Sequence, residues 1–280
     1  MILCDGNNFV WRSFHAAPDL RTKDGRYSGL LHIGLTMLSN MPDLFKPDRI
    51  LFLWDDKESW RKKIYPEYKG NRTKDSEIRN KVYPQMDVFK RILSLAGISN
   101  IQTPTLEADD LIGILTEDLN ARDENVVILS SDKDLLQLLR PNVIQIRGWK
   151  DRKVYLWTHD RLLDEYKIPP RSWPAYLALI GDKTDNIPNI RRGMGPKTAQ
   201  KILALSLYDS RWGITVEERK IFERNLKLTR VLTKGFNVEI PKQTERQDAQ
   251  WRELSRIIWD FELREVFYER SSIWKVGGWR

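Results

Sequence analysis

Three short runs of apolar residues stand out in the first half of the chain. They cover Met1–Cys4, Ile50–Trp54 and Val126–Leu129, and none of them alternates between apolar and polar positions. Unbroken aliphatic runs of this length are typical of strands that are covered on both faces of a parallel sheet. We therefore predict three buried, parallel strands.

Apolar residues at helical spacing fill the segments between these runs. The pattern predicts helices over Leu30–Leu44, Val82–Ala96 and Leu106–Leu119, with Thr105 as the N-cap of the third. Strands that alternate with helices predict an α/β fold with a mainly parallel central sheet flanked by helices. In such sheets ligands bind beyond the carboxyl ends of the strands, and each apolar run ends at acidic residues or at a Ser-Asp sequence.

Nine acidic residues recur in tight local groups. Any one of them alone is better explained as a solvated surface acid or a helix cap. Gathered at strand ends they would repel one another, so a shared site needs bound cations. Carboxylates without Cys or His partners suit Mg²⁺ or Mn²⁺ rather than zinc. The set consists of Asp5, Asp55, Glu107, Asp109, Asp110, Asp132, Asp134, Asp182 and Asp185. Asp56 competes with Asp55, which we prefer because it directly follows the apolar run.

The overall charge points to a polyanionic partner. The 280 residues carry a formal net charge of +8. Basic residues concentrate in the segment 57–74, where Trp60, Tyr65 and Tyr68 lie between them, as in surfaces that bind single-stranded nucleic acid. The single cysteine, Cys4, excludes a disulfide within one chain, and no apolar run approaches 18 residues. We expect a cytoplasmic protein without a membrane span.

Several short motifs occur in the order found in one known family. The chain resembles the 5′ nucleases, which include the 5′→3′ exonuclease domain of bacterial DNA polymerase I, bacteriophage 5′ exonucleases and flap endonucleases. Each motif alone is weak evidence, but together they are highly specific and span roughly residues 2–205. The matching segments are Ile2–Asn8, Trp54-Asp55, Pro66–Arg72, Glu107–Asp110, Ser131–Asp134, Gly181–Ile187 and Gly193–Ala199.

The resemblance assigns roles to particular residues. It implies that the nine acids hold two or more divalent ions, and that Arg12 and Lys69 contact the scissile phosphate. It also implies that the segment from about 57 to 84 forms a helical arch for single-stranded 5′ ends. Within that arch, Tyr68 would stack on a base and Arg72 would hold a phosphate.

The segment 193–199 resembles the helix–hairpin–helix element of these nucleases. Its DNA-binding residues would be Gly193, Gly195, Lys197 and Thr198, and its backbone carbonyls would bind K⁺. Glycines permit a close approach of the backbone, and the following helix offers free N–H groups to a phosphate. A phosphate-binding P-loop is excluded because Pro196 separates Gly195 from Lys197.

These inferences predict two parts of the chain. Residues 1–165 would form a PIN-like 5′ nuclease core that includes the arch. Residues 166–280 would form a helical lobe with the helix–hairpin–helix element at about 180–205 and a helical tail. The chain ends without a polymerase domain, so we expect a free-standing, monomeric protein of the bacterial cytoplasm, of the kind that phages encode.

The expected function is that of a structure-specific 5′ nuclease in replication or primer removal. It would hydrolyse phosphodiester bonds at 5′ flaps and 5′ ends of DNA, and RNA in RNA–DNA hybrids, by two-metal-ion catalysis. One alternative is a PIN-type endoribonuclease, but such domains lack the arch and the hairpin. The other is a non-catalytic module that binds DNA structures, for which missing carboxylates would be expected.

Overall fold

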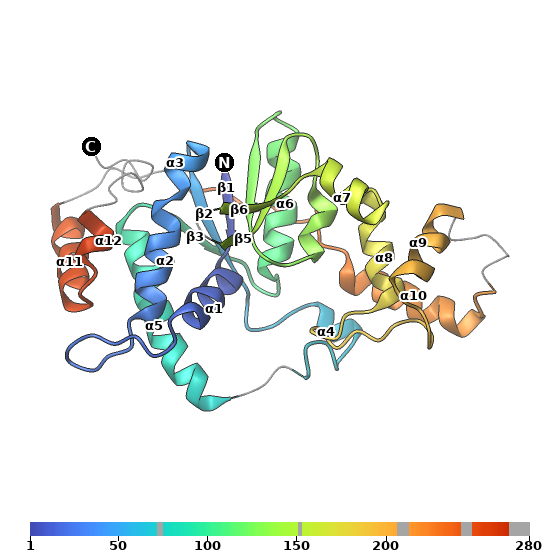
Figure 1. Cartoon of the computed structure of the whole chain (residues 1–280), viewed down its shortest axis with the longest axis horizontal. Helices are drawn as coiled ribbons and strands as arrows, with labels where there is room; N and C mark the ends of the chain where they lie inside the picture. The colour runs from blue at the N-terminus through green and yellow to red at the C-terminus, as the bar shows by residue number, and fades with distance from the viewer. Residues whose placement is uncertain (72–74, 151–152, 206–212, 242–247, 269–280) are drawn as a thin grey trace. The chain divides into compact units, whose positions relative to one another are not determined.

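The computed structural model describes residues 1–71, 75–150, 153–205, 213–241 and 248–268 (Figure 1). The chain divides into two compact units, each built from segments that are far apart in the sequence. Unit 1 comprises Met1–Asp55, Lys74–Gln102 and Val238–Arg280, and unit 2 comprises Asp56–Thr73 and Thr103–Asn237. This division differs from the boundary near residue 165 that we expected from the sequence.

Unit 1 contains three parallel strands in the order β3-β2-β1. These strands are β1 (Ile2–Asp5), β2 (Ile50–Trp54) and β3 (Ser99–Gln102). All residues of β1 and β2 are buried, which confirms two of the predicted strands. The outer strand β3 was not predicted, because it contains a single apolar residue, Ile101.

The helices of unit 1 follow the predicted spacing with one interruption. The predicted helix Leu30–Leu44 is divided at Asn40, because Pro42 has no N–H with which to continue a helix. The helix predicted at Val82 begins earlier, at Ser76, where the side chain of Asp75 caps it. The helices are α1 (Gly6–Ala16), α2 (Gly29–Ser39), α3 (Met41–Phe45), α5 (Ser76–Leu95), α11 (Asp248–Asp260) and α12 (Arg264–Tyr268).

Aromatic side chains join the helices of unit 1 to its sheet. The rings of Phe9 on α1, Phe52 on β2 and Phe89 on α5 lie 5.3–5.7 Å apart, within the range of favourable aromatic pairs. Gly6 follows β1 directly, and a Cβ there would lie 2.5 Å from the ring of Trp54. Only glycine therefore lets the chain turn from β1 into α1 at this point, immediately after Asp5.

The described part of the C-terminal region packs within unit 1. Arg91 on α5 forms two hydrogen bonds with Glu253 on α11, at 2.8 and 2.6 Å. Leu254, Ile258 and Leu263 are buried. The tail thus packs with the helices that flank β1–β3, and not with the residues from 166 onward with which the sequence had grouped it.

Unit 2 contains three strands in the order β4-β5-β6. β4 (Val126–Leu129) pairs with β5 (Val143–Lys150) in parallel, and β5 pairs with β6 (Lys153–Trp157) in antiparallel fashion. β4 coincides with the third predicted strand. The fold class is therefore the predicted α/β class with mainly parallel strand pairs flanked by helices.

The helices of unit 2 surround a core centred on Trp173, Tyr176 and Leu177. The helix predicted from Leu106 begins at Ala108, and its N-cap is Glu107 and not Thr105, whose backbone is left-handed (φ 66°). None of the helices in the described ranges is long and apolar enough to cross a membrane. The elements are α4 (Arg61–Ile64), α6 (Ala108–Asn120), α7 (His159–Tyr166), α8 (Trp173–Ile180), α9 (Pro196–Leu205), α10 (Val216–Thr229) and the 3₁₀ turns η1 (Asp134–Leu138) and η2 (Pro170–Ser172).

Candidate active site

The first turn of α6 carries three of the predicted acids of unit 2. Glu107 is the N-cap and is 5 % exposed, Asp110 is completely buried, and Asp109 is partly exposed. Free N–H groups at a helix N-terminus favour negative charge, which helps this turn to hold several carboxylates. The buried acids nevertheless require partners, because an isolated buried charge is costly.

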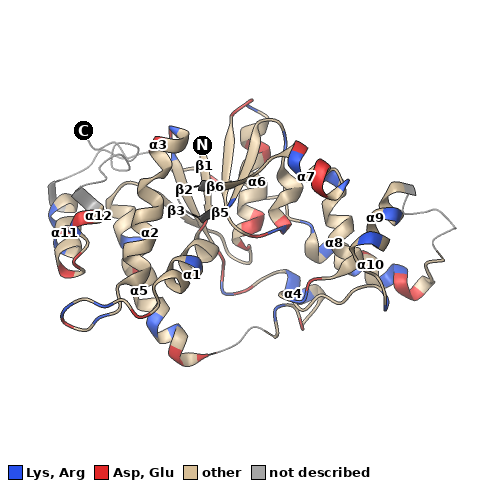
Figure 2. Cartoon of the chain, in the orientation of Figure 1, with Lys and Arg blue, Asp and Glu red and all other residues tan. Residues whose placement is uncertain are grey.

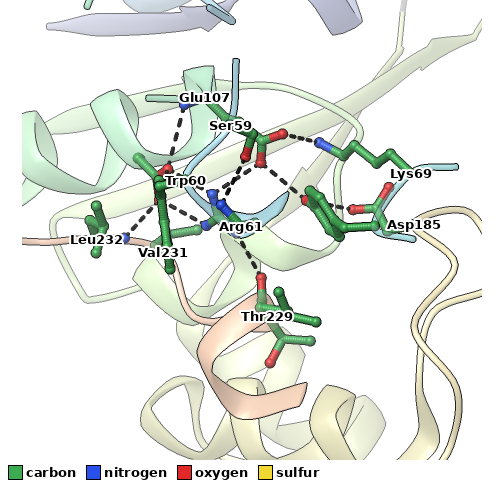
Figure 3. Close-up of polar contacts among 12 residues, drawn as sticks. Ser59, Trp60, Arg61, Lys69, Glu107, Asp185, Thr229, Val231 and Leu232 are labelled. Atoms are coloured by element: carbon green, nitrogen blue, oxygen red, sulfur yellow. Dashed lines mark hydrogen bonds and ion pairs between the residues drawn. The ribbon is translucent and has the colours of Figure 1, made fainter. Parts of the chain in front are cut away.

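Arg61 on α4 is the main partner of these buried acids (Figure 3). Its guanidinium binds both oxygens of Asp110, at 2.7 and 2.8 Å, and Oε2 of Glu107 at 3.0 Å. It also donates to the backbone oxygens of Leu228 and Arg230. Arg61 is 2 % exposed, so one buried cation connects α4, the start of α6 and the end of α10.

Both carboxylate oxygens of Asp110 accept more than one hydrogen bond. Besides Arg61, they accept hydrogen bonds from Nε1 of Trp60 at 2.9 Å and from the backbone N–H of Leu232 at 3.0 Å. Burial alone would lower the pKa of Arg61, but the charge and hydrogen bonds of Asp110 outweigh burial and raise that pKa above its usual value. Arg61 therefore keeps its positive charge although it is buried.

The carboxylate of Glu107 contacts Arg61, Lys69 and the hydroxyl of Tyr68. Its Oε1 lies 2.7 Å from Nζ of Lys69, and its Oε2 accepts a hydrogen bond from the Tyr68 hydroxyl at 3.0 Å. Burial tends to raise the pKa of Glu107, but Lys69 and Arg61 outweigh burial and hold the pKa below its usual value. Lys69, which the family resemblance places at the scissile phosphate, thus lies beside Glu107, one of the nine acids expected at the metal site.

Tyr68 does not have the surroundings that we expected. It is 3 % exposed, and its hydroxyl also lies 3.1 Å from Asp185. Burial and the two neighbouring carboxylates raise the pKa of Tyr68 well above its usual value, so the hydroxyl remains a hydrogen-bond donor. The expectation that this ring stacks on a base does not hold in this structure, because the ring is buried within unit 2.

Two of the sequence motifs interlock through their backbones. In the loop 181–187, the N–H groups of Asp182 and Ile187 bind each other's carbonyl oxygens at 2.8 and 2.7 Å. The backbone N–H of Lys69 donates to the carbonyl of Asp185 at 2.9 Å, and the amide of Asn186 donates to the carbonyl of Glu67 at 2.8 Å. The loop that carries Asp182 and Asp185 is thereby fixed to the segment that carries Lys69.

A second acidic pair follows β4. Oδ1 of Asp132 accepts a hydrogen bond from the backbone N–H of Asp134 at 2.9 Å. The buried amide of Gln145 on β5 donates to the carbonyls of Ser130 and Asp132 and fixes this turn. Lys133, between the two acids, forms an ion pair with Asp182 at 3.0 Å.

Asp132, Asp134, Asp182 and Asp185 are the acids of these two loops, and we call them the acidic cluster. Burial, followed by Asp132, Asp185 and Asp182, raises the pKa of Asp134 well above its usual value. Burial is also the main cause of the raised pKa of Asp132, to which Asp185 and Asp182 contribute. Oδ1 of Asp134 is buried and accepts no hydrogen bond within the described residues.

The acidic cluster is not a closed ligand set. Within the described ranges, no three Asp, Glu, His or Cys side chains are gathered tightly enough to form a ready-made metal site. Lys133 already neutralises part of the cluster's charge by binding Asp182, and Lys69 binds the neighbouring Glu107. The cluster nevertheless fits a cation, because Asp134 presents a buried carboxylate oxygen without a partner, and a raised pKa marks charge that a cation would stabilise.

Unit 1 contains three further residues that the sequence predicted for the site, Asp5, Asp55 and Arg12. Asp5 ends β1 and caps α1 by accepting a hydrogen bond from the N–H of Asn8 at 3.0 Å. Asp55 follows β2, and its N–H donates to the side chain of Asn7. Arg12 lies on α1, and burial lowers the pKa of its guanidinium.

The structure distinguishes between Asp55 and Asp56. Oδ2 of Asp56 accepts a hydrogen bond from the backbone N–H of Thr105 at 2.8 Å, and the N–H of Asp56 donates to the carbonyl of Leu106. Asp56 therefore anchors the chain beside the start of α6. Asp55, which follows the strand directly, stays the acid for which we expect the metal-binding role.

The glycine hairpin lies before α9. Gly193 has φ 81°, the N–H of Gly195 donates to the carbonyl of Gly193, and α9 begins at Pro196. A Cβ at either glycine would meet no atom within 4 Å, so space remains for another backbone to approach. Lys197 is exposed and Thr198 partly exposed in the first turn of α9.

The predicted arch is not a continuous helix. Residues 57–84 contain α4, a turn over residues 65–71 and the beginning of α5, and Arg72 lies outside the described residues. The segment is also divided between the two units. Figure 2 shows basic residues on α4, where Lys62 and Lys63 are exposed. Arg61, which also belongs to this basic segment of the sequence, is buried and contributes no charge to the surface.

Arg61 is the functional residue that the sequence did not reveal. It precedes two exposed lysines, and nothing in the local pattern distinguishes a buried arginine from an exposed one. Its bidentate contact with Asp110 involves a residue 49 positions away. The only available signal was Asp110 itself, since a buried carboxylate at a helix start requires a cation.

Comparison with known proteins agrees with this architecture. A family model described as the 5′-3′ exonuclease, N-terminal resolvase-like domain matches residues 1–167. The chain is 39 % identical over 204 residues to a 5′-3′ exonuclease of Aquifex aeolicus, which covers 72 % of this chain and 68 % of that protein.

Longer and more distant proteins are also similar. DNA polymerase I of Mycobacterium tuberculosis is 32 % identical over 208 residues, and the match covers 73 % of this chain but 23 % of the polymerase. Among solved structures, the T5 5′-exonuclease with bound divalent zinc ions has the same fold, with a TM-score of 0.66 at 15 % identity. The match covers 99 % of each chain.

Proposed function

The chain belongs to the 5′-3′ exonuclease family and is a nuclease, and we propose that it hydrolyses phosphodiester bonds at 5′ flaps and 5′ ends of DNA with two divalent cations. RNA in RNA–DNA hybrids is a second substrate of the same kind, as primer removal would require. We further propose that the protein acts as a monomer.

The acidic cluster is the observation that carries this proposal. Burial and nearby carboxylates raise the pKa of Asp132 and of Asp134, and one oxygen of Asp134 has no hydrogen-bond partner within the described residues. Such a group is unfavourable on its own and becomes favourable with Mg²⁺ or Mn²⁺. We propose Asp132, Asp134, Asp182 and Asp185 as ligands, together with Glu107 and Asp109. Asp5 and Asp55 are added on their motifs and on their positions at the ends of β1 and β2.

Asp110 belongs to the support of this site and not to its ligands. Its oxygens are taken by Arg61, Trp60 and the backbone of Leu232, so it has little to offer a cation. Arg61 and Asp110 together fix the position of Glu107. The role of Asp110 is thus a revision of the one that the sequence implied.

The basic residues act on the phosphates. Lys69, beside Glu107 and 14 % exposed at its side chain, would contact the scissile phosphate, as would Arg12. Gly193, Gly195, Lys197 and Thr198 would bind the phosphates of duplex DNA, with K⁺ at the hairpin carbonyls. When bound, divalent cations supply charge stabilisation for the leaving oxygen and lower the pKa of a water. The products would carry a 5′-phosphate and a 3′-hydroxyl.

A cleavage assay tests the proposal. The substrate is a duplex with a 5′-labelled single-stranded flap, incubated with Mg²⁺ or with EDTA, beside a single-stranded RNA of the same sequence. We expect flap cleavage that depends on Mg²⁺ and no comparable cleavage of the RNA. Equal cleavage of both substrates would instead favour an endoribonuclease.

Three variants assign the chemistry to the proposed residues. Asp132→Asn and Asp182→Asn should abolish cleavage while flap binding in Ca²⁺ persists. Lys69→Ala should slow single-turnover cleavage with little loss of stability, by about a hundredfold if Lys69 stabilises charge in the transition state. Arg171→Gln, a change of one exposed basic residue elsewhere in unit 2, is the matched control. Unchanged rates in the two aspartate variants would remove the metal-site assignment.

A further inference from the structure

A pocket of about 430 Å³ lies in unit 2 between α4 and the C-terminal end of α10. Its walls are mostly apolar and include Trp60, Ile64, Leu226 and Leu232. Its volume is within the range of sites for small organic ligands. None of the residues that line it belongs to the acidic cluster.

Charged residues stand at the rim of this pocket. Lys227 and Arg230 lie three positions apart, at the end of α10 and just beyond it, and both are exposed. Glu223 is the single acid among the lining residues. Lys62 and Lys63 are exposed and lie in the sequence between the lining residues Trp60 and Ile64, on α4, where Figure 2 shows basic residues.

The pocket adjoins the supports of the active site. Trp60, one of its walls, donates from Nε1 to Asp110 at 2.9 Å, and the guanidinium of the next residue, Arg61, lies 4.6 Å from the centre of the Trp60 ring. The backbone carbonyl of Arg230 accepts a hydrogen bond from Arg61. Figure 3 shows Trp60 and Leu232 on one side of Arg61 and Lys69 on the other.

An apolar chamber with an indole wall and a basic rim suits a ligand with a flat ring and a phosphate. Base–aromatic stacking provides affinity for any base, and lysine and arginine bind the phosphate. A purely apolar ligand would gain nothing from the two cations, and a small anion would gain nothing from the apolar walls. We propose that this pocket binds one unpaired nucleotide of the DNA substrate, with its base between Trp60 and the leucines and its phosphate at Lys227 and Arg230.

This proposal rests on the proposed function, because it assigns a part of the same substrate. The test is equilibrium binding by fluorescence anisotropy in Ca²⁺, with flap DNA that carries one abasic nucleotide at successive positions of the single-stranded arm. In the wild type, one position should weaken binding about tenfold, as expected for the loss of one stacked base. In Leu226→Trp, which fills the pocket, that position should lose its effect, whereas the isosteric Leu226→Met should keep it.

A pair of charge variants tests the phosphate contact independently. Lys227→Gln/Arg230→Gln should weaken flap binding several-fold more than the matched double variant Lys220→Gln/Arg171→Gln, which removes the same charge outside the lining. Since Lys227 and Arg230 are exposed, this variant should fold even if Leu226→Trp does not, and the abasic series is then repeated on it. The proposal is overturned by a flat abasic series in the wild type, by a series that the pocket variants leave unchanged, or by equal losses in the two charge variants.

The outcomes separate this proposal from the proposed function. A wild-type protein that cleaves no flap in Mg²⁺ but shows the abasic effect would overturn the flap-nuclease proposal and leave the pocket assignment standing. A protein that cleaves flaps with a flat abasic series would overturn the pocket assignment alone.

Discussion

Arg61 shows how a single residue can position the carboxylates of the proposed active site without being one of the proposed metal ligands. It is almost completely buried and joins Asp110, Glu107 and two backbone carbonyls. A buried ion pair of this kind contributes little net stability over an apolar pair, but removal of one partner leaves an uncompensated charge. Its value is therefore positional, because it fixes the carboxylate of Glu107 beside Lys69.

We expect Arg61→Met to destabilise the protein by about 3–5 kcal/mol, because Asp110 is left buried without a counter-charge. The double variant Arg61→Met/Asp110→Asn should regain a large part of that loss. Urea unfolding of the two single variants and the double variant measures the coupling. Additive losses in this cycle would contradict a direct interaction between the two residues.

Asp134, in contrast to Arg61, is expected to lower the free energy of unfolding at its position. Its pKa is raised by burial and by three neighbouring carboxylates, so the folded state disfavours its charged form at neutral pH. We expect Asp134→Asn to raise Tm in EDTA by a few degrees, since about 1 kcal/mol shifts Tm by about 2–4 °C in chains of roughly this size. The same variant should lose cleavage activity.

The gain in stability from Asp134→Asn should depend on pH, and the raised pKa of Asp134 determines the direction. An aspartate with a raised folded pKa carries its penalty above that pKa and loses it below the unfolded pKa of about 3.9. The gain from Asp134→Asn should therefore be present at neutral pH and vanish near pH 4. Calorimetric scans at both pH values provide the check, and a variant less stable than the wild type at neutral pH would show that Asp134 is compensated.

At the scale of the elements, the sequence predicted those strands that a local run of apolar residues marks. β1, β2 and β4 are unbroken apolar runs, and all were identified within one residue. β3 was missed because only Ile101 distinguishes it from a loop. The family motifs located the loop 181–187 and the segment 65–71. Their interlocking depends on hydrogen bonds from side-chain amides and from one backbone N–H to carbonyls more than 110 residues away, which no local pattern encodes.

Asn186 offers a test of this interlocking. It has φ 57° and donates its side-chain amide to Glu67. Asn186→Gly keeps the favoured backbone conformation and loses only the side-chain bond, whereas Asn186→Ala also strains the backbone. We expect faster amide hydrogen exchange in both 65–71 and 182–187 for each variant, and a greater loss of stability for Asn186→Ala.

Exchange that rises in the loop 182–187 alone would show that the two segments are not coupled. Asn71→Ala is the reciprocal variant, because Asn71 donates to the carbonyl of Lys183 at 2.6 Å from the other segment. It should affect the same two segments.

At the scale of the whole molecule, the charge distribution combines opposite tendencies. The chain has a net charge of +8, yet in unit 2 burial and neighbouring carboxylates raise the pKa of Asp132 and Asp134. The excess positive charge favours a polyanion, and the acidic cluster would repel it. Divalent cations bound as proposed would remove this conflict, because they would neutralise the cluster where a phosphate has to approach.

We predict that Mg²⁺ stabilises the folded protein and that the effect depends on pH. A ligand at 100 times its Kd adds about 2.7 kcal/mol to the free energy of unfolding, which corresponds to several degrees in Tm. Protons compete with cations for Asp132 and Asp134, whose pKa values are raised. The rise in Tm on addition of Mg²⁺ should thus be largest at pH 8 and decrease progressively toward pH 5.

Asp134→Asn supplies the control for this linkage. It removes one competing proton site and one proposed ligand, so both the Mg²⁺ effect and its pH dependence should decrease together. Scanning calorimetry with Mg²⁺ or EDTA at several pH values, at constant ionic strength, separates cation binding from general screening. A Tm shift that is independent of pH, or that persists unchanged in Asp134→Asn, would place the cation away from the acidic cluster.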